Sequence, residues 1–372
     1  MAGAAKVMLE FARAINEQEG GAKQPRIQFA VVSFSRAGVT GNHPVQAAFA
    51  AAGASVEVIH ETSRYDRRVV GELERLASTW QADIVLSNSV KGHFLAQMAR
   101  LPERCRWIAY HHGYTRTSWR TLLYNELDRW SLRGASRVAT VCQAFARDLR
   151  AKGIDPDRIS VIPIPVRQPG LETAAHDRRA LRERLGVSSS TLLLLNVGRL
   201  SAEKGQSDLM RAISVLQNRR PGLRFQCVIV GDGPERERLE RLKRRLRVDD
   251  QVQLAGYRND VQSFYFAADA FVLPSHSEGC PNVLLEALAT KLAVVATAVG
   301  GVPEFVRHEK DALLVRAKDP ESLAGGLQRV LESEPLRSQL SLSGSDVIQR
   351  HCPADFARRL IACFQKALAS AR

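Results

Sequence analysis

No stretch of this 372-residue sequence is apolar over a length that crosses a membrane. The most apolar run, residues 292–302, ends at Pro303, whereas a spanning helix needs about 20 predominantly apolar residues. The features of a signal peptide are also absent, because Lys6, Glu10 and Arg13 interrupt any apolar core at the start. Apolar residues make up 45% and charged residues 25%, which excludes a disordered or fibrous chain. We therefore expect a globular, cytoplasmic protein.

The cysteines show neither a metal-binding nor a disulfide pattern. None of the six stands in a C-x-x-C pair, and none has a histidine at zinc-finger spacing. We therefore expect buried reduced thiols instead of a disulfide framework or a structural zinc site. The sequence also has no internal repeat and no low-complexity segment.

Acidic residues are fewer than basic ones, at 39 against 53, so the formal net charge is +14. About half of this excess lies in residues 1–166. Such an excess favours anionic partners, which include nucleotide phosphates, nucleic acid and an acidic membrane leaflet. The densest charged run, residues 235–247, mixes both signs at helical spacing and indicates a solvated helix face. No nucleic-acid module is visible, so nucleic acid is not an expected partner.

Short β-branched runs alternate with longer helical patterns, which is the signature of parallel sheets with helices on both faces. Three prolines and a glycine within residues 163–170 indicate a linker between two such halves, and a polar stretch extends it to Asp177. We expect an α/β fold with one doubly wound domain over residues 1–166 and another over 167–350. The last helix, residues 354–370, is expected to cross back onto the first domain. The predicted strands are residues 27–34, 55–59, 83–87, 106–111, 137–141, 160–163, 191–197, 224–230, 252–255, 270–273, 293–296 and 312–315.

Ligands of such sheets bind beyond the carboxyl ends of the strands, which predicts a site in the cleft between two halves. The first motif at such a position is GRLSAEKG, residues 198–205, after the predicted strand 191–197. Gly198 lets a ligand approach the backbone closely. Arg199 and Lys204 stand five apart across the turn and can converge on one diphosphate. The alternative is a pair of solvated surface cations.

The second motif is PSHSEGCPNVLLE, residues 274–286, between a predicted buried strand and a predicted helix. Pro281 suits the first helical turn, and free N–H groups over Cys280–Leu284 can face an anion. Glu278 precedes the helix and Glu286 lies within it, so one carboxylate can reach a sugar ring while the other accepts from ribose hydroxyls. The alternative is a capped helix with two incidental acids.

Together, the two motifs resemble the retaining family-4 glycosyltransferases of GT-B architecture, with Glu278 and Glu286 separated by seven residues. Three further segments agree with that family: VGDGP at residues 230–234, GYR at 256–258 and GGVPE at 300–304. The resemblance covers nearly the whole chain. It implies two Rossmann-like domains facing across a cleft, and the transfer of a sugar from a nucleotide-diphosphate sugar to an acceptor.

The resemblance also implies roles for single residues. Arg199 and Lys204 match the cations that hold the donor diphosphate. Glu278 matches the acid near the hydroxyls of the transferred sugar, and Glu286 matches the ribose ligand. His112, in the segment YHHG, matches the histidine near the reaction centre. The implied catalytic residues are His112, Arg199, Lys204 and Glu278, and the implied donor-binding residues are Gly3, Gly198, Arg199, Lys204, Arg258, Glu278, Gly279, Cys280, Pro281, Asn282, Val283 and Glu286.

No cofactor is implied, because the nucleotide sugar is a substrate. In the family mechanism, a departing phosphate oxygen takes the acceptor proton in a same-face displacement, and the protein supplies positioning and charge. The first half shows no convincing carboxylate nucleophile. The one Asp-x-Asp, Asp155-Pro156-Asp157, lies between a predicted helix and a predicted strand, where it indicates a turn. We therefore expect an enzyme that needs no metal.

The start of the chain departs from the family pattern. Residues 1–14 look like the family's Gly-rich turn and first helix, but the strand that should come before them is absent. That strand is central in a doubly wound sheet, so its loss leaves strand edges unpaired. Either the true start lies upstream of Met1, or the protein tolerates the loss.

The implied partners are a nucleotide-diphosphate sugar and a glycan or lipid-linked acceptor in the synthesis of a polysaccharide or glycolipid. The basic first half suits peripheral association with the anionic inner face of a membrane. Two alternatives stay open. One is a non-catalytic, glycosyltransferase-like partner subunit, and the other is a GT-B sugar-nucleotide epimerase.

Overall fold

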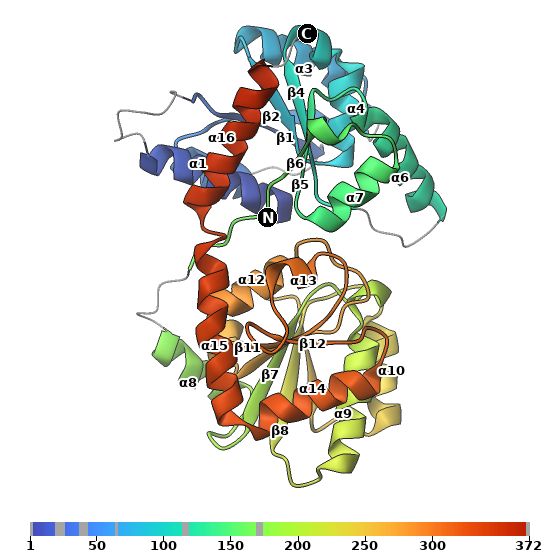
Figure 1. The fold of residues 1–372 in the computed structure, drawn as a ribbon, viewed down its shortest axis with the longest axis vertical. Helices are drawn as coiled ribbons and strands as arrows, with labels where there is room; N and C mark the ends of the chain where they lie inside the picture. The colour runs from blue at the N-terminus through green and yellow to red at the C-terminus, as the bar shows by residue number, and fades with distance from the viewer. Residues whose placement is uncertain are drawn as a thin grey trace. The chain divides into compact units, whose positions relative to one another are not determined.

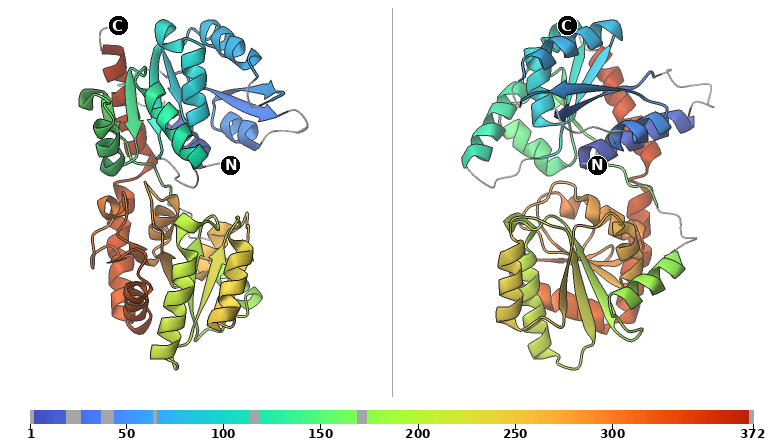
Figure 2. Two further views of the ribbon diagram at one scale, coloured as in Figure 1. Left: turned by 90° about the vertical axis from the view of Figure 1, so that its right-hand side faces the viewer. Right: turned by 180° about the vertical axis from the view of Figure 1, so that it is seen from behind.

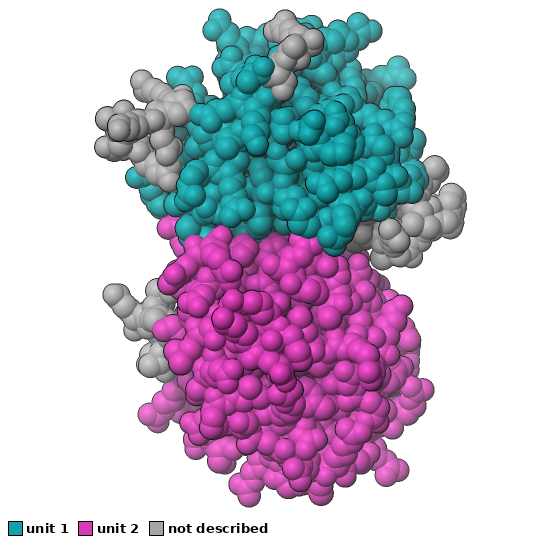
Figure 3. Space-filling model, in the orientation of Figure 1, with its two compact units in different colours: residues 1–165, 352–372 teal, residues 166–351 magenta. Residues whose placement is uncertain are grey.

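The computed structural model describes residues 3–18, 27–36, 44–63, 66–113, 119–168 and 174–369. The chain divides into two units, which are coloured separately in Figure 3. Unit 1 comprises residues 1–165 and 352–372, and unit 2 comprises residues 166–351. The last helix therefore belongs to unit 1, as the sequence predicts.

Unit 2 contains a six-stranded parallel sheet in the order β12-β11-β10-β7-β8-β9. The order reverses between β7 and β10, which lie side by side, so their carboxyl ends meet at one edge. The Asn196 side chain ties this pair together, since its Nδ2 donates to the Val272 carbonyl oxygen at 2.9 Å. All six strands lie within one residue of their predicted ends: β7 (Leu192–Val197), β8 (Phe225–Val230), β9 (Val252–Gly256), β10 (Ala270–Leu273), β11 (Ala293–Thr297) and β12 (Leu313–Val315).

Helices pack on both faces of this sheet (Figure 2). On one face, Leu194 and Val272 from the strands share a buried core with Ile213 and Leu327 from the helices. Burial on both faces is the reason why the central strands are near-continuous apolar runs. The first face carries α9 (Gln206–Arg219), α10 (Arg236–Leu246) and α14 (Pro320–Glu332), and the second carries α11 (Val261–Ala267) and α12 (Asn282–Ala289). Helix α15 (Glu334–Gln349) packs against α12, α14 and β11.

Helix α8 (Ala174–Arg184) corrects the predicted linker, which we extended to Asp177. This segment is polar, but its arginines find partners on the end of the unit 2 sheet. Arg182 donates to Asp269 Oδ2 at 3.0 Å and to the Thr191 carbonyl oxygen at 2.5 Å. The helix therefore packs against α11 instead of extending as a linker. Residues 169–173 of the predicted linker lie outside the described ranges.

Unit 1 holds two parallel sheets instead of one doubly wound sheet. Its first described element is a helix, α1 (Gly3–Gln18), and no strand among the described residues joins β1 to β3. The apolar residues of β3 are only half-buried, whereas Trp107 and Tyr110 in the neighbouring β4 are fully buried. One sheet pairs β1 (Ala30–Arg36) with β2 (Ser55–Glu61), and the other has the order β3 (Ile84–Ser87), β4 (Arg106–His111), β5 (Arg137–Thr140) and β6 (Ile159–Val161).

Helix α16 (Pro353–Ala369) lies beside α1 and packs on the four-stranded sheet (Figure 1). The Phe356 ring lies 6.3 Å from the ring of Phe11 and 6.3 Å from that of Tyr110, measured between centroids. This aromatic contact joins the two ends of the described chain into one core.

The opposite face of the four-stranded sheet is covered by helices whose apolar side chains, such as Leu132 and Leu149, pack against Trp107. No helix within the described ranges has the length and apolar character needed to cross a bilayer. The remaining helices of unit 1 are α2 (Pro44–Ala51), α3 (Arg68–Thr79), α4 (Val90–Met98), α5 (Leu101–Arg104), α6 (Trp119–Leu132) and α7 (Gln143–Ala151).

Replacing Phe356 by alanine should lower the stability of unit 1 by about 3–5 kcal/mol, because it empties a buried aromatic position. All four tryptophans lie in unit 1, so their fluorescence during urea unfolding reports this unit alone. Leu368→Ala is the matched control, since Leu368 lies on the same helix and is 52% exposed. Equal unfolding midpoints for the two variants would contradict the role of this core.

Candidate active site

The candidate residues of unit 2 meet where its strand order reverses. The loop after β7 carries Arg199 and Lys204, and the loop after β10 carries Glu278. Because β7 and β10 are neighbours, residues 74 positions apart come together, and Lys204 Nζ donates to Glu278 Oε1 at 2.7 Å. Open α/β sheets bind their ligands at such a reversal point, so this edge is the candidate site.

The Glu278 carboxylate is 8% exposed and is held firmly in place. Besides Lys204, the Ser275 hydroxyl donates to the same Oε1 at 2.6 Å. The main chain of Glu278 rests on Gly300, which has a φ of +53° and where a Cβ would lie 1.8 Å from the Glu278 carbonyl oxygen. Only glycine fits there. Within the described chain, Oε2 of Glu278 has no protein partner and is available to a ligand hydroxyl.

In the loop after β7, the space where a side chain of Gly198 would lie is open. A Cβ at this glycine would meet no atom nearer than 3.9 Å. The buried Gln206 side chain shapes the loop from below, because its Nε2 donates to the Arg199 carbonyl oxygen at 3.0 Å. The Arg199 side chain is exposed and makes no ion pair within the described ranges. Its guanidinium is therefore available to an anion.

The start of α12 differs from the prediction in one respect. Pro281 is the N-cap, with extended backbone, and Asn282 is the first helical residue. The Leu284 N–H, which we expected to be free, donates to the Pro281 carbonyl oxygen at 3.0 Å. In the described structure, the N–H groups of Asn282 and Val283 make no such bond. Two amides at a helix N-terminus, instead of a longer series, can therefore face an anion. Gly279 and Cys280 are half-buried in the preceding loop.

Glu286 is held by a residue that the sequence analysis missed. Tyr265, on α11, donates its hydroxyl to Glu286 Oε2 at 2.9 Å. Burial raises the pKa of Tyr265, and the charge of Glu286 raises it further, so the hydroxyl stays protonated and keeps donating. The signal in the sequence is a tyrosine within an otherwise apolar run before a buried strand, since a buried tyrosine hydroxyl needs a partner.

Arg258, one of the implied donor-binding residues, is already paired. Its Nε donates to Asp260 Oδ1 at 3.0 Å, and its guanidinium lies over the Phe264 ring at 5.6 Å. The hydrogen bond from Arg258 lowers the pKa of Asp260 to about 2. Tyr257 beside it is 71% exposed. This arrangement presents an aromatic ring and a fixed cation on the surface of unit 2.

In unit 1, His112 directly follows β4, and its Nε2 bonds Asn88 Oδ1. Burial, with a smaller contribution from the charge of His93, lowers the pKa of His112 to about 4. His93 is itself buried and bonds Asp128 Oδ1 through Nδ1 at 2.8 Å. His112 is therefore neutral at pH 7 and can donate or accept a hydrogen bond. His111 is a buried strand residue, as predicted.

Two other predicted features lie elsewhere in unit 1. Gly3 begins α1, where its backbone forms part of the first turn. Asp155 caps a short 3₁₀ helix, Pro156–Arg158, and its side chain accepts from the Asp157 N–H at 2.9 Å. The Asp-x-Asp sequence is therefore a turn, as predicted. Over the described ranges, no group of three or more His, Cys, Asp or Glu side chains is arranged to hold a metal ion.

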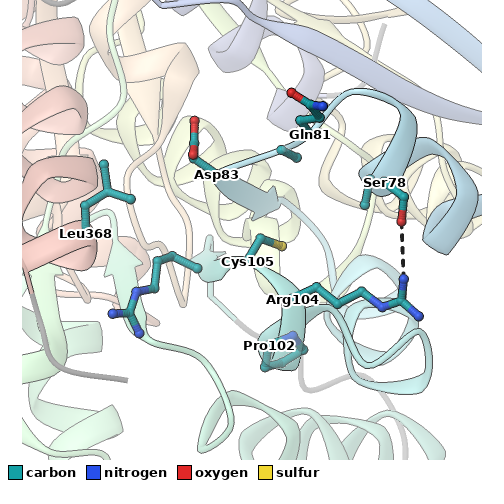
Figure 4. Close-up of a pocket in the computed structure, with 10 residues that line it drawn as sticks. Ser78, Gln81, Asp83, Pro102, Arg104, Cys105 and Leu368 are labelled. Carbon is teal, nitrogen blue, oxygen red and sulfur yellow. Dashed lines mark hydrogen bonds between the residues drawn. The ribbon is translucent and has the colours of Figure 1, made fainter.

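A pocket in unit 1 lies at the wrong edge of the sheet for this site (Figure 4). Asp83 and Cys105, which line it, directly precede β3 and β4, so the pocket lies at the amino ends of the strands. His112 lies at the carboxyl end of β4. Because ligands of open α/β sheets bind at carboxyl ends, we do not assign the pocket to the candidate site.

Two family models match the chain. One describes a glycosyl transferase 4-like domain and matches residues 3–165, and the other describes glycosyl transferases group 1 and matches residues 177–345. The chain belongs to the group 1 glycosyltransferases. This confirms the resemblance seen in the sequence, and the two matched regions fall on unit 1 and unit 2.

Curated relatives align over part of their length. A D-inositol 3-phosphate glycosyltransferase of Acidothermus cellulolyticus is 39% identical over 220 residues, which cover 55% of this chain and 48% of the relative. LpsD, a lipopolysaccharide core biosynthesis glycosyltransferase of Rhizobium meliloti, is 33% identical over 168 residues, with 45% and 47% covered. This glycosyltransferase chain spans about half the length of the curated relatives it matches.

Solved structures match over nearly the whole chain. HepE of Anabaena, in complex with UDP-glucose, gives a TM-score of 0.81 at 19% identity and covers 98% of this chain and 96% of its own. WaaG, a glycosyltransferase involved in lipopolysaccharide biosynthesis, gives 0.68 at 16% identity, with 100% and 97% covered. The fold is therefore GT-B, as predicted.

The buried histidines predict how the stability of unit 1 depends on pH. Burial lowers the pKa of His111 to about 3 and that of His112 to about 4, whereas an unfolded histidine has a pKa of about 6.5. Below pH 6.5 the unfolded chain therefore binds protons that the folded unit does not. Unfolding free energy should fall by about 1.4 kcal/mol per pH unit for each histidine, down to the folded pKa.

Urea unfolding followed by tryptophan fluorescence between pH 7 and pH 5 measures this slope. His111→Gln should flatten it, because one of the two groups no longer titrates. His60→Gln, at an exposed position of the same unit, should leave the slope unchanged. An identical slope in wild type and His111→Gln would contradict the assignment.

Proposed function

We propose that this protein transfers a sugar from a nucleotide-diphosphate sugar to a hydroxyl of a glycan or lipid-linked acceptor, with retention of configuration and without a metal ion. The contact between Lys204 and Glu278 carries the proposal, because it places a cation for phosphate beside a carboxylate for sugar hydroxyls. The relatives support a role in cell-surface polysaccharide or glycolipid synthesis, since LpsD acts in lipopolysaccharide core biosynthesis.

The diphosphate of the donor would bind the exposed Arg199 guanidinium and the Lys204 ammonium, with the amides of Asn282 and Val283 nearby. Lys204 now bonds Glu278. A phosphate oxygen would share that ammonium, and Glu278 would then accept from hydroxyls of the transferred sugar. The further proposed donor contacts are Gly198, Gly279, Cys280 and Pro281 through their backbone, Glu286 at the ribose, Arg258 at the nucleobase, and His112 and Gly3 from unit 1.

In the proposed reaction, the bond between the anomeric carbon and the phosphate oxygen breaks, and the acceptor oxygen forms its new bond on the same face. The departing phosphate oxygen takes the acceptor proton, so no protein base is required. Arg199 and Lys204 neutralise the negative charge that grows on the departing diphosphate, which is where electrostatic stabilisation contributes most.

Lys204→Ala should reduce turnover at least about 100-fold, because it removes one of two cations from the leaving diphosphate. The same change should abolish the thermal shift caused by the matching nucleoside diphosphate among UDP, GDP and ADP, measured without metal. A ligand at about 100 times its dissociation constant adds ~2.7 kcal/mol to wild type, enough to detect. Lys310→Ala, at an exposed position of the same unit, is the control and should behave as wild type. Near-normal turnover in Lys204→Ala would overturn the mechanism.

The split sheet of unit 1 favours a second candidate, a non-catalytic subunit that binds the nucleotide sugar for a partner. Such a subunit would show the diphosphate shift but neither transfer nor hydrolysis of the sugar. An epimerase would release a free or altered sugar instead of a glycosylated acceptor. Product analysis therefore separates a glycosyltransferase, a non-catalytic subunit and an epimerase.

We also propose that unit 1 docks peripherally on the anionic cytoplasmic face of a membrane. Met98, Leu127 and Trp130 are 57%, 46% and 65% exposed, and they lie on α4 and α6, which pack together. The exposed Arg100 and Arg133 follow the ends of the same two helices. Leu127 and Trp130 lie one turn apart on α6, and exposed tryptophan, aliphatic and arginine side chains suit the interface of an anionic leaflet.

Vesicle co-sedimentation tests this surface. Wild type should bind vesicles that contain anionic lipid more tightly than purely zwitterionic ones, and added salt should weaken this binding. The double variant Leu127→Ser/Trp130→Ser should bind about tenfold more weakly or worse, because two apolar side chains no longer enter the leaflet. Leu342→Ser, at a 70% exposed position of unit 2, should bind as wild type does. Unchanged binding by the double variant would contradict the assignment.

A further inference from the structure

His276 belongs to the second sequence motif, but none of the roles proposed above involves it. It lies in the loop after β10, two residues before Glu278. Its backbone N–H donates to the Glu203 carbonyl oxygen at 2.8 Å, in the loop that carries Lys204. The two loops of the donor site are therefore already joined at the backbone through His276.

The side chain of His276 makes a second link between the same elements. Its Nε2 donates to Asp208 Oδ2 at 2.7 Å, and Asp208 lies in the first turn of α9, directly after the loop of Lys204. Arg211 Nη1 donates to the other oxygen, Oδ1, at 2.8 Å. The carboxylate is 14% exposed and the imidazole 22% exposed, so solvent screens this bond only partly.

The backbones of the Lys204 loop and the Glu278 loop are in direct contact. Gly205 has a φ of +67°, and a Cβ there would lie 2.0 Å from the Pro274 carbonyl oxygen. Contact this close is stable only if something holds the two backbones together. Three interactions link the two loops. They are the backbone hydrogen bond of His276, its side-chain hydrogen bond to Asp208, and the ion pair of Lys204 with Glu278.

These links respond differently to a bound donor. A diphosphate attracts the Lys204 ammonium and weakens its bond to Glu278, since phosphate oxygens compete for the same charge. The bonds of His276 involve neither the ammonium nor the Glu278 carboxylate. They are therefore the links that still fix the distance between the two loops when the donor is bound.

We propose that His276 is a positioning residue, whose bond to Asp208 locks the Lys204 loop to the Glu278 loop so that the donor site keeps its shape while Lys204 turns to the diphosphate. This inference rests on the proposed donor site, and it adds a pair of residues that touch no substrate. Replacing His276 or Asp208 should therefore weaken donor binding more than it destabilises the fold.

The test is calorimetric titration of wild type with UDP, GDP and ADP, followed by the same titration of variants with the diphosphate that binds. His276→Ala and Asp208→Ala should each raise the dissociation constant about tenfold, as expected for loss of a charge-assisted hydrogen bond. The double variant should be no worse than either single one, because both remove the same bond.

Side-chain length supplies the matched controls. The amide nitrogen of glutamine reaches about as far as Nε2 of histidine, so His276→Gln should bind like wild type. Asparagine is too short, so His276→Asn should bind like His276→Ala. Arg211→Ala removes the partner of the other Asp208 oxygen and should stay within about twofold of wild type. A purely structural role would not produce this rescue by glutamine.

The outcomes separate the two proposals. If wild type binds none of the three diphosphates, the proposed donor site fails, and the inference fails with it. If wild type binds one of them and His276→Ala and His276→Asn bind it equally well, the donor site stands and the role of His276 is overturned. Additive losses in the double variant would also overturn it, since they would show that the two residues act separately.

Discussion

The pairing of β7 with β10 is the constraint on which the candidate site depends. It brings the ends of two strands, which are far apart in the sequence, to one edge of the unit 2 sheet. Asn196 bridges them inside the sheet, where its Nδ2 bonds the Val272 carbonyl oxygen. The loop after β7 and the loop after β10 therefore begin at adjacent strand ends. This places Lys204 and Glu278 within hydrogen-bonding distance of each other.

Both carboxylates of the candidate site in unit 2 are fixed by hydroxyl donors. Ser275 holds Glu278, and the buried Tyr265 holds Glu286. Charged groups buried without partners would shift toward their neutral forms. Here the two hydroxyl donors hold both carboxylates in fixed orientations. Preorganisation of this kind lowers the penalty of ordering a polar site when a ligand arrives.

Much of this organisation follows from the sequence, and the misses have physical causes. The strands of unit 2 are readable because buried parallel strands are continuous apolar runs. The motif residues Lys204 and Glu278 mark the site because their spacing resembles that of a known family. Tyr265 and the partner of His276 were missed because such contacts join separate elements and leave no periodic signal. Helix α8 was predicted as linker, since Arg182 and its neighbours are polar and only the folded sheet supplies their acceptors.

Because the strands of unit 1 form two separate sheets, we expect the two sheets to differ in how readily they open locally. Two-stranded sheets are marginal on their own, and β1 with β2 shares no strand ladder with β3–β6 in the described chain. Helices α2 and α3 pack on β2 of this ribbon, and Ile59, Val69 and Phe34 belong to one small apolar cluster. Amide protons of the ribbon should therefore exchange with solvent through local opening, long before those of β4. We expect unit 1 to combine a fast-exchanging ribbon, β1 with β2, and a slow-exchanging four-stranded sheet.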